Sequence, residues 1–151
     1  MLSAADKRIA AGLLILRLFL GVFLLQWSVE KLILPSATIR IAQGFYGIAL
    51  PQAATYALGV AELVLSLALL FGAYRTVSYG LSLLVHTVTV AVSWRQLFDP
   101  YGFAKVGNHL WIATWPTWGA FAALFLMRNS DEFTIDGWRK AQSRSPGRSV
   151  S

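Results

Sequence analysis

The chain of 151 residues is 56% hydrophobic and only 13% charged, whereas a soluble domain carries about 25% charged residues. This balance excludes an ordinary soluble domain and favours a membrane protein, and the length fits one domain. The lack of cysteine excludes disulfides, zinc–thiolate sites and thiol redox chemistry.

Four apolar blocks follow one another along the chain, each close to the ~20 residues that cross ~30 Å of hydrocarbon. Helices are expected in all four, because an isolated strand cannot satisfy its backbone in lipid. Their predicted bounds are 9–29, 54–73, 76–94 and 108–127. The predicted fold is an all-α integral membrane four-helix bundle over residues 1–137, followed by a polar, disordered cytoplasmic tail over 138–151.

The connections between the blocks predict how the helices are joined. Only Ala73–Thr76 connects the second block with the third, so these two helices should form an antiparallel hairpin. The first connection is longer and contains an amphipathic segment, Ala37–Tyr46, that could lie on the membrane surface. Within the fourth block, Pro116 is expected to kink the helix, because proline lacks the backbone N–H.

The distribution of basic residues predicts that both termini are cytoplasmic, because lysine and arginine concentrate on that side of a membrane. Four spans would place both ends of the chain on one side, together with Lys7, Arg8, Arg75, Arg128, Arg139, Lys140, Arg144 and Arg148. The opposite side would hold Lys31, Arg40, Arg95 and Lys105, with Trp27, Trp94 and Trp111 at the outer interface. The basic residues behind the net charge of +6 then set the membrane topology and contact lipid headgroups, and we expect no nucleic-acid partner.

Three ionisable residues fall inside the apolar blocks, namely Arg17, Glu62 and His86. Counting ~1.5 Å per residue from the cytoplasmic ends of the predicted helices places them ~12, ~16 and ~15 Å deep. We therefore predict an Arg17–Glu62 ion pair with His86 nearby, on inward helix faces of small and hydroxylated residues. Such a layer could be purely structural, with Arg17 reaching the headgroups instead of Glu62. Alternatively it could be a proton relay or a site for a quinone ring.

A second cluster of polar and aromatic residues is expected at the outer face. Its members are Glu30, Lys31, Trp94, Arg95, Asp99, Lys105, Asn108, His109 and Trp111. The cluster could be ordinary interfacial anchoring, a docking site for an external partner, or the mouth of a quinone pocket. Trp111, Trp115 and Trp118 share one face of the fourth helix, an arrangement more typical of packing than of a cofactor site.

The two histidines do not suggest a metal or a haem. His86 and His109 differ in predicted depth by roughly 10 Å or more, which argues against a haem held between them. No spacing of histidines and carboxylates matches a metal-binding helix motif, and there is no phosphate-binding glycine loop or nucleophile elbow. We predict neither haem nor metal, and a quinone is the one possible cofactor.

Several motifs resemble the DoxX family in their order and spacing. They are Arg17-x-x-x-Gly21, Lys31-Leu32-x-x-Pro35, Glu62, Gly72-x-x-Arg75-Thr76, His86 and Phe133-Thr134-Ile135-Asp136. The resemblance spans about residues 10–137, although Ser28 stands where the family often has glycine and the Arg95–Asn108 connection is long and aromatic. It implies a four-helix protein of the bacterial inner membrane. The family's name comes from a relative of a subunit of thiosulfate:quinone oxidoreductase, and other relatives are thought to assist redox enzymes or oxidative-stress complexes.

The resemblance and the polar layer lead to three functional hypotheses. In the first, the chain is a quinone-linked membrane subunit of an oxidoreductase: Glu62 and His86 exchange protons or bind the quinone ring, and Arg17 keeps Glu62 ionised. Electrons would then come from a bound substrate or from a partner membrane or periplasmic redox protein. In the second, the chain is a non-catalytic scaffold that recruits or stabilises a partner enzyme. A small transporter is less favoured, because four helices without an inverted repeat leave little room for alternating access unless the chain forms a homo-oligomer.

Overall fold

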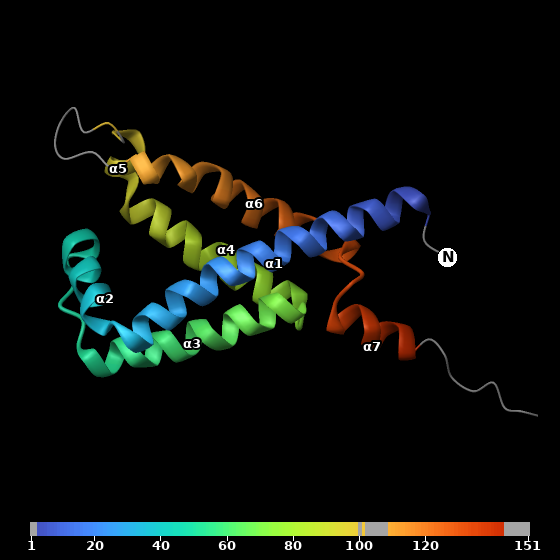
Figure 1. Cartoon of the computed structure of the whole chain (residues 1–151), viewed down its shortest axis with the longest axis horizontal. Coiled ribbons are helices and arrows are strands. Elements are labelled where there is room, and N and C mark those ends of the chain that lie inside the picture. Colours follow the sequence, from blue (N-terminus) through green and yellow to red (C-terminus); the bar gives the residue numbers. More distant parts are fainter. Residues whose placement is uncertain (1–2, 100, 102–108, 144–151) are drawn as a thin grey trace, which may run out of the picture.

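A computed structural model describes residues 3–99, 101 and 109–143, and the secondary structure of these residues consists of helices, without strands (Figure 1). The all-α prediction is therefore confirmed for these residues. The α-helices are α1 (Ala4–Ile33), α2 (Pro35–Ile41), α3 (Gln52–Phe71), α4 (Arg75–Val92), α5 (Trp94–Phe98), α6 (Thr114–Leu126) and α7 (Ile135–Ser143). Between them lie the π-helix η1 (Ala42–Tyr46) and the 3₁₀ helices η2 (His109–Ala113) and η3 (Arg128–Ser130).

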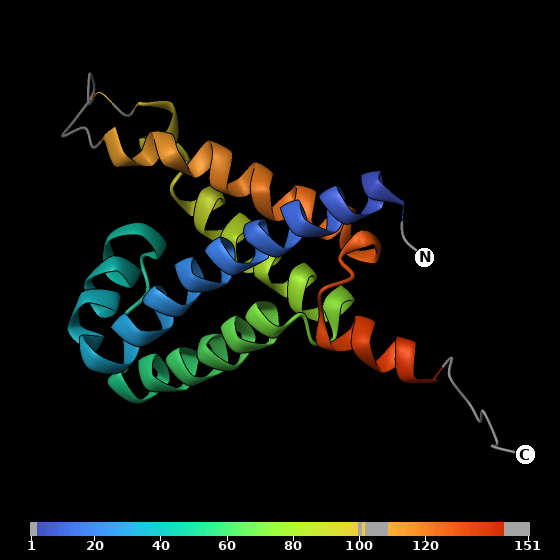
Figure 2. The ribbon, with the colours of Figure 1, turned by 45° about the vertical axis from the view of Figure 1, so that its right-hand side comes forward.

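The longest helices, α1, α3, α4 and α6, run back and forth between two ends of the molecule (Figures 1 and 2). One end holds the start of α1, the Gly72–Tyr74 turn between α3 and α4, and α7, and we call it the terminal end. The other end holds α2 and α5, and we call it the distal end. Helices α3 and α4 form the antiparallel hairpin expected from their short connection.

Helix α1 is longer than the sequence analysis predicted, because its start is set by a cap rather than by hydrophobicity. The Ser3 hydroxyl accepts the Asp6 backbone N–H, and the Asp6 carboxylate accepts the Ser3 backbone N–H, which is a capping box. The helix therefore begins at Ala4 rather than at residue 9, and it ends at Ile33 rather than at residue 29.

Pro116 marks the start of α6 rather than a kink within it, contrary to the sequence prediction. It lies in the first turn of α6, which is preceded by η2. Because proline has no N–H for the carbonyl of the residue four before it, here Ile112, the α-helix cannot continue toward the N-terminus. The Thr117 hydroxyl donates to the Ala113 carbonyl at 2.7 Å and so satisfies a carbonyl at this junction.

Beside an apolar core that includes Leu13, Leu69 and Phe121, the helices bury serines and His86, as predicted for the inward faces, and expose many large apolar side chains. Ser28, Ser66, Ser82 and His86 are buried, whereas Phe19 is 75% exposed. The serine hydroxyls donate to backbone carbonyls of their own helices, as in the 2.6 Å bond from Ser66 to the Glu62 carbonyl, so their burial leaves no free hydroxyl donor. Helices α1 and α3 are each long and apolar enough to cross a membrane.

Helices α1 and α3 approach most closely where one of them carries glycine. A Cβ added at Gly21 would lie 2.5 Å from the Leu70 side chain, and one at Gly59 would lie 2.8 Å from Leu32. These two contacts fix the antiparallel register of the pair, with Gly21 level with Leu70 and Gly59 level with Leu32.

We predict that Gly21→Leu separates α1 from α3 and lowers the free energy of unfolding by about 1–3 kcal/mol, the usual cost of overpacking. The measurement is equilibrium unfolding in mixed detergent micelles. Gly12→Leu is the matched control, because a Cβ at Gly12 meets nothing within 4 Å. Equal effects of the two substitutions would contradict this packing.

Candidate functional site

The most deeply buried charged groups are Arg17 of α1 and Asp131, which follows η3. The Arg17 side chain is 2% exposed and that of Asp131 is 0% exposed, and Arg17 Nε lies 3.3 Å from Asp131 Oδ2. Arg17 Nη2 also donates to the Phe133 carbonyl at 2.5 Å. This ion pair ties α1 to the chain segment that follows α6.

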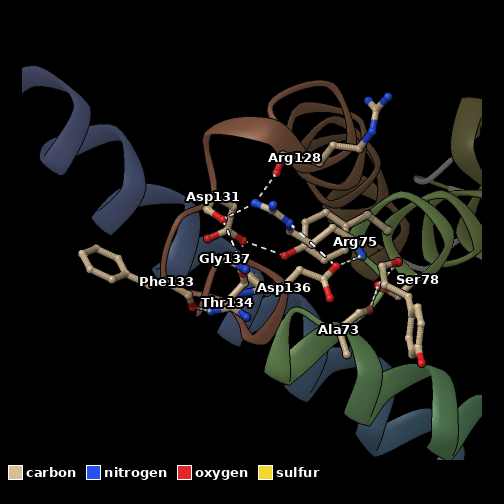
Figure 3. Close-up of polar contacts among 12 residues, drawn as sticks. Ala73, Arg75, Ser78, Arg128, Asp131, Phe133, Thr134, Asp136 and Gly137 are labelled. Carbon is tan, nitrogen blue, oxygen red and sulfur yellow. Dashed lines mark hydrogen bonds and ion pairs between the residues drawn. The ribbon is translucent and has the colours of Figure 1, made fainter. Parts of the chain in front are cut away.

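Helix α4 contributes two further residues to the same network (Figure 3). The Tyr79 hydroxyl donates to Asp131 Oδ2 at 2.6 Å, so the carboxylate is bonded from two helices. Arg75 Nη1 donates to the Asp131 carbonyl at 2.5 Å and to the Arg128 carbonyl at 3.1 Å. Arg17 and the Tyr79 hydroxyl both contact Oδ2, so the carboxylate has a counter-charge and a donor despite complete burial, whereas its Oδ1 has no hydrogen-bond partner.

Asp136 attaches α7 to the turn between α3 and α4. Its carboxylate accepts the Arg75 backbone N–H at 2.8 Å, at the first residue of α4, and lies 3.9 Å from Arg75 Nε. A carboxylate at a helix N-terminus is favourable because the orphan N–H groups there carry partial positive charge. We call Arg17, Arg75, Tyr79, Asp131 and Asp136 the terminal network.

Gly72 makes the terminal network possible through its lack of a side chain. Its φ of 63° is left-handed, as is usual for the residue that follows a helix. A Cβ at this position would collide with Arg17 Nη1 and with the Thr134 side chain. Glycine is therefore required both by the turn and by the close passage of the Arg17 guanidinium.

The predicted Arg17–Glu62 ion pair is wrong. The register of α1 against α3 brings Arg17 level with Gly72, and Glu62 lies ten residues earlier in α3, which is about 15 Å along its axis. The depth estimate failed because it aligned the start of α1 at residue 9 with the end of α3. In the structure α1 begins at Ala4 and extends past that end.

Glu62 instead pairs with Lys31 near the distal end of α1. Lys31 Nζ lies 2.6 Å from Glu62 Oε2, and the two side chains are 18% and 12% exposed. Lys31 also donates to the Trp27 carbonyl at 3.3 Å, and its ammonium group lies 5.9 Å from the Trp27 ring centroid. The carboxylate expected at a polar centre is thus neutralised by a residue that the sequence analysis had assigned to the outer face.

His86 is buried among aromatic rings rather than beside a carboxylate. Its ring centroid lies 5.6 Å from that of Phe23 on α1 and 5.2 Å from that of Phe121 on α6, and the residue is 6% exposed. Its Nε2 has no hydrogen-bond partner. The structure therefore does not unite Arg17, Glu62 and His86 in one polar layer, because each packs against a different partner.

The predicted outer cluster is divided among several elements at the distal end. Lys31 is committed to Glu62, and Glu30 lines a shallow apolar groove of about 400 Å³ along α1. Arg95 lies over the Trp94 ring at 5.4 Å, both in α5, and Trp111 of η2 packs on Phe45 of η1 at 5.4 Å. Asp99 directly follows α5.

The remaining members of that cluster lie wholly or partly outside the described residues. Lys105 and Asn108 fall outside them, and for His109 the structure gives the backbone, at the start of η2, but not the side chain. Within the described part of the chain, no group of three or more histidine, aspartate or glutamate residues could hold a metal ion.

A larger groove opens beside Arg17 at the terminal end. It has a volume of about 780 Å³ and lies between α1, the end of α3 and the segment from Glu132 to Ala141. Glu62 and His86 line neither this groove nor the one along α1.

The sequence analysis did not identify Tyr79 or Asp131 as site residues. One signal was available for Asp131: three of the seven acidic residues of the chain, Asp131, Glu132 and Asp136, stand within a span of six residues that follows the last apolar block. Such a group is a natural source of counter-ions for the unpaired arginine in the first helix. The tyrosine carried no comparable signal, because its alignment with Asp131 depends on the tertiary fold.

A comparison with protein families identifies the family of the chain. The DoxX family model matches residues 12–94, which is more than half of the chain. The chain belongs to the DoxX family. The matched region includes Arg17, Arg75 and Tyr79, whereas Asp131 and Asp136 lie beyond it. Searches of curated proteins and of solved structures give no significant match.

Family membership and the two apolar helices indicate a membrane protein. The terminal network then joins the DoxX-matched helices to the segment after α6. The network suits a structural role, because each of its charged groups contacts an opposite charge or a backbone group.

We predict that Asp131→Asn lowers the free energy of unfolding by about 3–5 kcal/mol, because it leaves the buried Arg17 charge without compensation. The measurement is unfolding of the purified protein in mixed micelles. The neighbouring exposed variant Glu132→Gln is the control and should change stability by less than about 0.5 kcal/mol. Equal stability of both variants would mean that the Arg17–Asp131 pair is not essential to the fold.

Proposed function

We propose that this DoxX chain is a multi-pass protein of the bacterial inner membrane that acts as a non-catalytic scaffold for a partner redox enzyme. Four spanning segments are proposed, namely α1, α3, α4, and η2 together with α6. Helix α4 has 18 residues and η2 with α6 covers His109–Leu126, each enough for about 27 Å of helix at 1.5 Å per residue. Their outer faces are apolar, with Leu84 56% and Leu126 75% exposed, as contact with lipid requires.

The charge distribution supports cytoplasmic termini. Among the described residues, the terminal end carries Lys7, Arg8, Arg75, Arg128, Arg139 and Lys140. The distal end carries Lys31, Arg40 and Arg95, and Lys31 is already neutralised by Glu62. Because basic residues concentrate on the cytoplasmic side, this asymmetry favours a cytoplasmic terminal end and a periplasmic distal end.

The observation that carries the scaffold proposal is that the buried Asp131 and the largely buried Glu62 are each paired with a cation of the same chain. Arg17 holds Asp131 and Lys31 holds Glu62, so these charges have a structural explanation. Truncating either partner of such a pair would leave an uncompensated charge and destabilise the fold. A structural role alone therefore explains why both residues of each pair are present. In this proposal the chain provides a binding surface for the partner enzyme and does not itself catalyse a reaction.

The distal end supplies the docking surface for the partner in this proposal. Trp94 is 54% and Phe98 71% exposed on α5, and Arg95 lies beside Trp94. Exposed aromatic residues with arginine are the residue types enriched in protein interfaces. Glu30 and Trp111 belong to the same proposed surface, which would meet a membrane or periplasmic redox protein.

A quinone-linked role is the second candidate, and the environment of His86 favours it. The ring is buried between Phe23 and Phe121 and its Nε2 lacks a partner, so a ligand oxygen there would satisfy a buried polar atom. The grooves described above do not reach His86 or Glu62, so neither of them is a quinone pocket at these residues. For this reason the scaffold is preferred.

The two candidates are tested by purifying the tagged protein in mild detergent and analysing co-purified proteins and quinones by mass spectrometry. The scaffold proposal predicts a specific partner whose yield falls about tenfold in the double variant Trp94→Ala/Arg95→Ala, because interface aromatic and arginine residues carry most binding energy. Arg40→Ala, an exposed basic residue also at the distal end, is the control.

The quinone measurement decides between the candidates. The scaffold proposal predicts the same trace quinone content in the wild type and in His86→Phe, which replaces the imidazole by a ring of similar size. One quinone per chain that is lost in His86→Phe, together with a loss of quinone-dependent electron transfer in Glu62→Gln, would replace the scaffold by the quinone-linked role.

A further inference from the structure

Helix α1 carries two polar side chains on a face that the other long helices leave open. Gln26 is exposed, and Glu30, one turn later on the same face, is half-buried. Both line the shallow groove of about 400 Å³ along α1. Figure 2 shows α1 crossing in front of α4 and α6, so one side of it is not covered by these helices. The rest of the groove is apolar and consists of Leu25, Val29, Ile33 and Leu34.

The register of α1 against α3 places both polar side chains deep in the proposed membrane. The close contacts at Gly21 and Gly59 set the level of the two helices. Gln26 and Glu30 lie between these contacts along α1 and are therefore level with the middle of α3. At 1.5 Å per residue this level is about 10 Å or more from either end of α3. In the bilayer proposed above, the two side chains would thus lie at the depth of the hydrocarbon, where an uncompensated charge is costly.

The charges at this level do not balance within the chain. Lys31 directly follows Glu30, but its ammonium group lies 2.6 Å from the Glu62 carboxylate. One cation therefore stands beside two carboxylates. In the part of the chain that the structure describes, the side chains of Gln26 and Glu30 have no hydrogen-bond or ion-pair partner. Because polar and ionisable residues inside a membrane face a partner or water, we expect a protein element rather than lipid to cover this face.

The unpaired carboxylate of Glu30 determines which protein element suits the face. A lysine or arginine at the same depth would compensate its charge, and the Gln26 amide can donate to a backbone carbonyl or a hydroxyl of an approaching helix. A second copy of the chain fits poorly. Two chains of the same orientation that pack through this face about a two-fold axis would place their Glu30 carboxylates side by side, and these like charges repel.

We propose that the Gln26–Glu30 face of α1 binds a membrane-spanning helix of the partner protein, and that this helix carries a lysine or arginine at the level of Glu30. Val29 and Ile33 pack against the partner helix beside the ion pair. This role rests on the scaffold function proposed above and specifies its partner, which must have a membrane-spanning part. Glu30 contacts that part at a deeper level than the exposed residues of α5 at the distal end.

The experiment measures binding of the full chain to synthetic membrane-spanning helices in phosphatidylcholine vesicles by fluorescence energy transfer. Each probe is a leucine–alanine helix of about 20 residues, with lysine at its centre in one probe and leucine in the other. The wild type is expected to bind the lysine helix about tenfold more tightly, as one hydrogen bond between charged groups would give. Overall electrostatic attraction cannot produce this preference, because the chain has a net charge of +6.

Two variants test the site in different ways. Glu30→Gln removes the charge and should abolish the preference for the lysine helix, whereas Glu132→Gln, an exposed acid at the terminal end, should retain it. Val29→Trp fills the groove and should weaken binding of the lysine helix about tenfold through overpacking. Its control is Val64→Trp, because Val64 is 62% exposed on α3 and does not line the groove.

Equal binding of the two probes by the wild type would overturn the assignment of a basic partner helix. A preference that survives in both Glu30→Gln and Val29→Trp would overturn the site. Energy transfer between labelled copies of the chain that is lost in Glu30→Gln would assign the face to a second copy instead. Because the probes replace the partner enzyme, these results are obtained independently of the co-purification that tests the scaffold function.

Discussion

Arg17 and Asp131 are almost completely buried, so each needs the other to compensate its charge in the folded protein. Much else at the terminal end follows from this requirement. Gly72 must lack a side chain so that the guanidinium can pass, and Tyr79 must reach the same carboxylate from α4. The segment after α6 must turn back toward α1 to deliver the aspartate.

The ion pair also connects the two parts of the chain that the family comparison separates. The DoxX match ends at residue 94, yet its buried arginine is neutralised by a residue beyond that limit. A second pair, Lys31–Glu62, joins α1 to α3 toward the distal end. Helix α1 is therefore held by one ion pair at its middle and by another in its last turn. Arg17 and Glu62, which the sequence analysis considered as functional residues of the matched region, therefore both form ion pairs within the chain.

The sequence sufficed for features that depend on local pattern and failed for those that depend on register. The all-α class, the family, the α3–α4 hairpin and the inward faces of serine and His86 follow from periodicity, connection length and motifs. The Arg17–Glu62 pair was wrong because the register of α1 against α3 depends on the close contacts at Gly21 and Gly59, which hydrophobicity alone does not show. Asp131 was missed because it lies in a polar segment far from Arg17 in sequence. The effect of Pro116 was misjudged because a proline in the first turn of a helix marks where that helix begins, whereas only a proline further inside a helix bends it.

The central claim, that Arg17 and Asp131 stabilise the fold as a pair, is tested most directly by a double-mutant cycle. The variants are Arg17→Met, Asp131→Leu and the combination, compared by equilibrium unfolding in mixed micelles. Each single variant leaves an uncompensated buried charge, whereas the double variant leaves none, so the double variant should be more stable than either. The coupling energy should then exceed the cost of a single variant, which is about 3–5 kcal/mol. Additive losses, with the double variant the least stable of the three, would contradict the account.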